Sequence, residues 1–161
     1  MKIKPWGYLL FILLALIILF YPLCILEIKN EKTAQIILWS RTAPGDQFEF
    51  IYTHSVDKTP VLGVFLITSK RTIKPIETHF LSYGTGLPSV EGKIDEEEGT
   101  LIAKPEVDEL KQFSFFVSPF TEQLLIFKRH RIDFSSMNEG DIITISVTRY
   151  PIGKMLFKYG S

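Results

Sequence analysis

The chain has 161 residues, of which 46% are hydrophobic, and its 18 basic and 18 acidic side chains give a formal net charge of zero. A nucleic-acid-binding domain would need a basic surface, so the composition argues against a nucleic-acid partner. Cys24 is the only cysteine, which excludes an intramolecular disulfide.

The first predicted element is an apolar helix over residues 5–26, a stretch without a charged side chain. At about 1.5 Å per residue such a helix is about 33 Å long, enough for a hydrocarbon core of about 30 Å. A cleaved signal peptide would end at a pair of small residues, which this segment lacks. Lys2 and Lys4 precede the segment, so the positive-inside rule keeps the N-terminus in the cytoplasm. We therefore expect residues 1–26 to be a tail and a single-pass cell-membrane anchor, and residues 27–161 to be an extracytoplasmic domain.

Alternating apolar and polar residues predict strands through most of the remaining chain. In residues 47–55, the side chains of Phe48, Phe50, Tyr52 and His54 share one face. Further strands, rich in β-branched and aromatic residues, are expected at 36–39, 61–68, 76–81, 113–117, 123–127 and 142–147. Many short strands separated by turns predict an all-β fold, either an antiparallel β-sandwich or a small barrel.

Two segments between these strands are predicted to adopt other structures. Residues 105–112 begin with proline and acidic side chains, a pattern typical of a short helix. The acidic run at 95–98 lacks the ligand spacing of a calcium loop, so a solvated loop is expected there.

The first candidate site is a polar segment where one predicted strand ends and the next begins. It contains His54, Ser55, Lys58, Thr59 and Pro60. Neighbouring residues of a strand point to opposite faces, so His54 cannot readily act as the base for Ser55. Two interpretations remain: a structural histidine at the edge of the core, and a hydrolase in which His54 works with a distant serine such as Ser82.

The second candidate is a glycine-rich segment that contains Tyr83, Gly84, Thr85 and Gly86. Two glycines around a threonine can expose backbone N–H groups as an anion-binding nest, which leaves a small-ligand or peptide contact open. No Walker lysine follows, so a nucleotide loop is not expected. The alternative is a tight turn in which the glycines adopt positive φ.

The remaining polar residues favour no metal or cofactor. His54, His79 and His130 do not occur at a recognised zinc-ligand spacing, so we expect no metal site and no cofactor. The basic cluster at residues 128–131 is either a solvated hairpin end or a contact for anionic lipid or an acidic partner.

The two candidate segments together resemble the signature of the domain of unknown function 1850 family. The resemblance rests on residues 52–61, Tyr-Thr-His-Ser-Val-Asp-Lys-Thr-Pro-Val, and on residues 82–88, Ser-Tyr-Gly-Thr-Gly-Leu-Pro. The sequence departs from the family pattern at Gly63, where an acidic residue is expected.

The resemblance implies a role near a transporter. Members are small proteins, often with one N-terminal membrane segment, whose genes commonly lie beside those of TAXI-type TRAP solute importers. We therefore expect a non-enzymatic accessory or binding domain that contacts the TRAP membrane subunit or its solute-binding protein. The alternative function is the membrane-tethered hydrolase.

Overall fold

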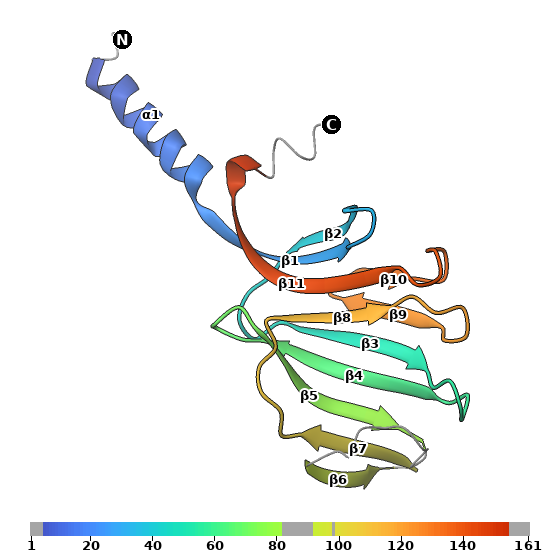
Figure 1. The fold of residues 1–161 in the computed structure, drawn as a ribbon. Coiled ribbons are helices and arrows are strands. Elements are labelled where there is room, and N and C mark those ends of the chain that lie inside the picture. Colours follow the sequence, from blue (N-terminus) through green and yellow to red (C-terminus); the bar gives the residue numbers. More distant parts are fainter. Residues whose placement is uncertain (1–4, 82–91, 98, 155–161) are drawn as a thin grey trace.

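The computed structural model describes residues 5–81, 92–97 and 99–154, which form α1 and eleven β-strands (Figure 1). The helix α1 spans Pro5–Phe20. The strands are β1 (Pro22–Asn30), β2 (Ile36–Arg41), β3 (Gln47–Thr53), β4 (Pro60–Ile67), β5 (Ile73–Phe80), β6 (Gly92–Glu97), β7 (Thr100–Pro105), β8 (Gln112–Phe116), β9 (Gln123–Phe127), β10 (His130–Asp133) and β11 (Ile142–Pro151).

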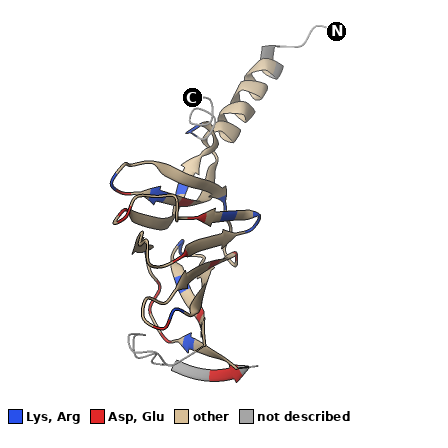
Figure 2. Cartoon of the chain, turned by 90° about the vertical axis from the view of Figure 1, so that its right-hand side faces the viewer, with Lys and Arg blue, Asp and Glu red and all other residues tan. Residues whose placement is uncertain are grey.

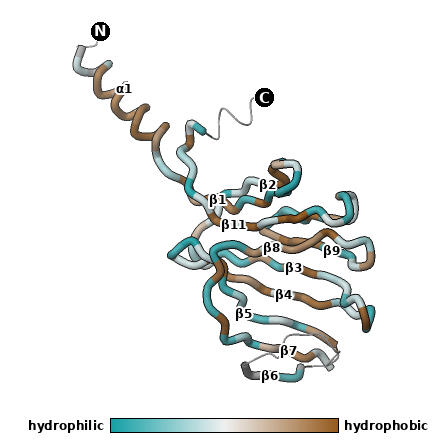
Figure 3. Tube along the Cα trace, viewed as in Figure 1, coloured by the Kyte–Doolittle hydropathy of each residue, from teal (hydrophilic) through white to brown (hydrophobic). Residues whose placement is uncertain are grey.

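The helix α1 projects away from the sheets and is apolar on all sides (Figure 3). Its side chains are largely exposed, with Leu9 at 73% and Phe11 at 71%. Within the described part of the chain, no helical stretch has the length and apolarity needed to cross a bilayer.

The predicted apolar helix is shorter than expected, and the prediction that it continues to residue 26 is wrong. The helix ends at Phe20, and residues 22–26 are the first half of β1. Two causes act together. Pro22 disfavours the helical conformation at Tyr21, and β1 pairs along its length with β11, Pro22 lying opposite Pro151. The apolar run therefore serves two elements, the helix and a strand of the core.

The strands form two antiparallel sheets, which confirms the all-β prediction. One has four strands in the order β2-β1-β11-β8, and the other has seven in the order β10-β9-β3-β4-β5-β7-β6. The four-stranded sheet packs against part of the larger sheet as a sandwich, and β7 and β6 extend beyond it (Figure 1).

All seven strands expected from the sequence are present, but two further predictions are corrected. The predicted helix at 105–112 is wrong, because Pro105 ends β7 and Leu110 pairs with Ile73 through both backbone groups. The acidic loop expected at 95–98 is wrong for residues 95–97, which lie in β6. The side chains of Asp95 and Glu96 are nonetheless exposed. Four strands, β1, β6, β7 and β10, were not expected.

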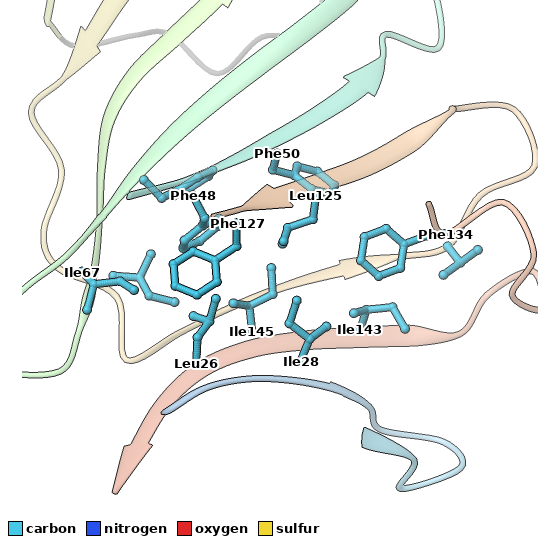
Figure 4. Close-up of a cluster of buried hydrophobic side chains, with 13 residues drawn as sticks. Leu26, Ile28, Phe48, Phe50, Ile67, Leu125, Phe127, Phe134, Ile143 and Ile145 are labelled. Atoms are coloured by element: carbon cyan, nitrogen blue, oxygen red, sulfur yellow. The ribbon is translucent and has the colours of Figure 1, made fainter. Parts of the chain in front are cut away.

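The larger apolar core lies between the two sheets (Figure 4), and a smaller buried cluster on the larger sheet consists of Val61, Phe80, Leu101 and Ala103. Phe48 and Phe50 enter it from β3, as their alternation predicts, and are at most 5% exposed. Phe127 of β9 is fully buried and faces the strands of the smaller sheet, which contribute Leu26 and Ile145. Burial of such side chains is the main favourable term in folding.

A hydrogen-bonded group on the smaller sheet joins its strands beside the helix. The Glu27 carboxylate of β1 accepts hydrogen bonds from the Trp39 indole and, at 2.9 Å, from the Tyr150 hydroxyl. The Trp39 and Tyr150 rings lie 4.6 Å apart. Burial, with the Glu27 carboxylate as a further cause, raises the pKa of Tyr150 to about 12.

This raised pKa predicts alkaline sensitivity that Tyr150→Phe should reduce. The Tyr150 pKa is higher in the folded chain than its ordinary value of 10. The contribution of the protonated Tyr150 hydroxyl to stability is therefore complete below pH 10 and is lost as the pH rises towards 12. At pH 8 the free energy of unfolding of the variant should be about 1–2 kcal/mol lower than that of the native chain, because the variant loses a hydrogen bond to a carboxylate. Between pH 10 and 12 it should lose less further stability than the native chain.

Urea unfolding of the full chain in detergent at several pH values measures both effects. Tyr21→Phe is the control, since Tyr21 is 58% exposed. An alkaline decline of the same size in Tyr150→Phe and the native chain would contradict the assignment.

Candidate functional site

The first candidate segment forms the closed turn between β3 and β4. The His54 N–H donates to the Thr59 carbonyl at 2.8 Å, and the Lys58 N–H donates to the His54 carbonyl at 3.0 Å. Lys58 has φ +56°, a left-handed conformation that a side chain other than glycine adopts at some cost. The predicted residues His54, Ser55, Lys58, Thr59 and Pro60 are therefore brought together on one short, internally bonded turn.

The His54 ring is oriented by Asp57 of the same turn. Its Nδ1 atom accepts a hydrogen bond from the Asp57 N–H at 3.3 Å and lies 3.6 Å from Asp57 Oδ2. The side chain is only 12% exposed. When Nδ1 accepts, the proton of the neutral ring is on Nε2.

This arrangement of the His54 ring differs from that in a serine hydrolase. In a serine hydrolase the Nδ1–H donates to the carboxylate, so that Nε2 can take the proton of the serine. Here a backbone N–H occupies Nδ1. Among the described residues, the hydrogen bond to the His54 ring comes from Asp57 and not from a serine. The His54 ring and backbone are thus both hydrogen-bonded within the turn.

The rest of the turn faces solvent. Ser55, Lys58 and Pro60 are exposed and Thr59 is half-buried, while Val56 at the tip is 64% exposed. The turn therefore presents a hydroxyl, an ammonium and an apolar group on a fixed backbone, which is typical of a recognition loop on a rigid scaffold.

The second candidate segment lies outside the described residues. Tyr83, Gly84, Thr85 and Gly86, together with Ser82 of the hydrolase alternative, belong to residues 82–91. Their predicted roles stay predictions.

The three histidines are on different elements: His54 follows β3, His79 is on β5, and His130 begins β10. His79 is 3.0 Å from Glu77 of the same strand. No cluster of three or more His, Cys, Asp or Glu side chains suited to a metal ion occurs among the residues that the structure describes.

Two exposed aromatic residues beside the turn were missed by the sequence analysis. Phe116 ends β8 and is 67% exposed, and Phe120 in the β8–β9 connection is 72% exposed. This connection adjoins the β3–β4 turn, because the Thr53 N–H donates to the Glu122 carbonyl. The sequence offered one indication of this exposure, since Phe120 directly follows the predicted turn at Ser118 and Pro119. We call Ser55, Val56, Lys58, Phe116 and Phe120 the distal surface, since β3 and β8 both end on the side of the sandwich away from α1 (Figure 1).

Gly63, the departure from the family pattern, has a packing role. It is buried on β4 opposite Phe50, and a Cβ atom there would lie 2.9 Å from the Phe65 ring. That ring stacks on Phe48 with the centroids 4.9 Å apart. Glycine at this position lets the Phe65 ring lie across the strand, so an acidic side chain would displace part of the core.

The fold and the polar turn define a class of protein, an all-β sandwich that follows an apolar N-terminal helix. Residues 48–134, more than half of the chain, match the family model described as domain of unknown function (DUF1850). The chain belongs to this family. The match covers the seven-stranded sheet and β8, whereas β1, β2 and β11 lie outside it. Searches of the curated proteins and of the solved structures found no match.

Proposed function

We propose that this chain is a membrane-anchored extracytoplasmic accessory domain that works by protein–protein contact, without catalysis, beside a TAXI-type TRAP solute importer. The observation that carries the proposal is the helix α1, which is apolar on all sides, is exposed over most of its length and is joined to β1 through Tyr21 alone. A helix that is apolar all round needs an apolar environment.

The bilayer is the environment that we propose for α1. The helix, drawn without any charged residue in Figure 2, has 16 residues and is therefore about 24 Å long. This is shorter than the hydrocarbon core of about 30 Å, a mismatch that local thinning of the bilayer can accommodate. Lys2 and Lys4 support an N-terminus in the cytoplasm and a sandwich outside it.

The distal surface is the contact that we propose for the partner. It combines two exposed phenylalanines with a polar turn, and aromatic residues are enriched where protein interfaces bury most area. The proposal that the partner is the importer rests on the family resemblance. Contact is preferred to hydrolysis because the His54 ring is held by its own turn.

In-cell photo-crosslinking tests the proposal. A photoreactive residue at Lys58 should capture the TRAP membrane subunit or its solute-binding protein, identified by mass spectrometry. The same residue at Ser69, exposed in the β4–β5 turn on the helix side, is the matched control and should not capture them. Phe120→Ala should reduce capture from position 58 by at least about tenfold, because truncating a central aromatic of an interface typically costs 2 kcal/mol or more.

Two results would contradict this proposal. Equal capture of importer components from positions 58 and 69 would show that the distal surface is not the contact. A preparation from native membranes that contains the chain but none of the importer would remove the proposed partner.

A further inference from the structure

A group of exposed cations surrounds the point where α1 leaves the sandwich. They are Arg41, Lys128, Arg129, Arg149 and Lys154, here called the basic rim. They come from β2, the β9–β10 turn, β11 and the residues after it. Segments far apart in the sequence therefore bring like charges to one end of the fold.

Backbone contacts locate the rim at the helix. The Ile152 N–H donates to the Tyr21 carbonyl at 3.2 Å, and a Cβ atom on Gly153 would lie 3.0 Å from the Leu19 side chain. The end of α1 is therefore held against the residues that follow β11. Lys154 is the next residue along, and its ammonium lies 4.8 Å from the centre of the Tyr150 ring.

The other rim residues adjoin the same strand ends. Arg149 pairs with Cys24 across β1 and β11, and Arg41 pairs with Ile25 across β1 and β2. The Lys128 ammonium donates to the Arg41 carbonyl at 2.8 Å, so the β9–β10 turn lies beside the end of β2.

One carboxylate is bonded to this group and is already engaged. Asp46 lies 2.8 Å from Lys128 and also accepts hydrogen bonds from Thr42 and Ala43. Burial opposes ionisation of Asp46, but Lys128 and these two donors outweigh it and hold the pKa of Asp46 below its ordinary value. The carboxylate thus positions Lys128, while Arg129, Arg149 and Lys154 remain exposed to solvent.

We propose that the basic rim docks on the anionic phospholipid headgroups of the bilayer that holds α1. The inference rests on the membrane anchoring proposed above. With only Tyr21 between helix and sandwich, the rim is the part of the domain nearest the surface that α1 enters. Basic groups close to a membrane attract anionic lipid and lose this attraction within about a Debye length. Docking would turn the distal surface away from the bilayer and towards a partner.

Reconstituted full-length chain tests the inference. A fluorophore on Ala43→Cys, in a Cys24→Ser background, reports the approach of the exposed β2–β3 loop to lipids that carry a headgroup quencher. Vesicles of phosphatidylcholine with 30% phosphatidylglycerol should give strong quenching at low salt. Vesicles of phosphatidylcholine alone should give weak quenching, and 0.5 M salt should abolish the difference.

A matched pair of triple variants assigns the effect to the rim. Arg129→Gln, Arg149→Gln and Lys154→Gln together should lower the docked-to-undocked ratio about a hundredfold, because each cation contributes roughly fivefold. Lys74→Gln, Lys104→Gln and Lys111→Gln together remove as many exposed charges outside the rim and should leave the quenching unchanged.

The outcomes separate this inference from the anchoring itself. Chain that floats with both kinds of vesicle after a salt wash, but shows the same quenching in both, keeps the anchor and overturns the docking. Chain that does not float overturns the anchor and the docking with it. If the rim variants lost a bound acidic protein while the lipid quenching stayed the same, the rim would bind that protein and the proposal that it binds lipid would be wrong.

Discussion

Replacement of Phe127 with alanine should lower the free energy of unfolding by about 3–5 kcal/mol. The side chain is fully buried on β9 and contributes to the core between the two sheets (Figure 4). The substitution removes buried apolar area and leaves a cavity that neighbouring strands cannot fill without disturbing their pairing with other strands. Urea unfolding of the full chain in detergent, followed by circular dichroism of the strands, measures the change.

Phe116→Ala is the matched control for this substitution. It makes the same chemical change at a residue that is 67% exposed, so the stability should change by no more than about 0.5 kcal/mol. If both variants lost the same stability, the assignment of Phe127 to the core would be wrong. Phe116 belongs to the distal surface, so the variant also serves in the crosslinking experiment.

Replacement of Asn30 with alanine should cost about 3 kcal/mol, a large effect for a polar residue. The Asn30 amide donates to the Asp141 carboxylate at 2.7 Å, and both side chains are about 5% exposed or less. The Asn30 side-chain oxygen Oδ1 also accepts hydrogen bonds from the backbone N–H groups of Lys32 and Thr33. Alanine would leave a buried carboxylate with Lys32 at 3.9 Å as its remaining ion-pair partner, and an unsatisfied buried charge is costly.

A double-mutant cycle separates this interaction from simple loss of packing. Asn30→Ala and Asp141→Ala should each destabilise the chain, and together they should cost at least about 1 kcal/mol less than the sum. Asn138→Ala, at an exposed residue of the neighbouring loop, should have little effect. Strict additivity of the first two substitutions would show that the carboxylate does not depend on Asn30.

The β3–β4 unit shows how far local sequence reasoning reached. Alternation placed Phe48 and Phe50 on the core face, and polar residues after Thr53 predicted the turn that now contains His54 and Lys58. The orientation of the His54 ring could not be predicted, because it depends on a hydrogen bond from the Asp57 backbone. Nor did the pattern indicate that Phe116 and Phe120 lie beside this turn, since the connection is a contact between β3 and the residue before β9.

The first apolar segment shows where that reasoning failed. Hydropathy cannot separate a lipid-facing helix from a buried strand when both lack charge, so residues 22–26 were assigned to the helix. Pairing of β1 with β11, at the other end of the chain, decides their conformation. The predicted helix at 105–112 failed for a related reason: Leu110 exchanges backbone hydrogen bonds with Ile73, a partner that no local pattern can identify.

The amino-acid sequence by itself determined the all-β class, the seven strands with strong alternation, the polar β3–β4 turn and the membership of a family whose model matches residues 48–134. These features depend on the periodicity and turn chemistry of neighbouring residues. Only the tertiary structure decided where α1 gives way to β1, which cations form the basic rim, and which aromatics stand beside the His54 turn. Those depend on backbone pairing and packing between residues far apart in the chain, which no local pattern specifies.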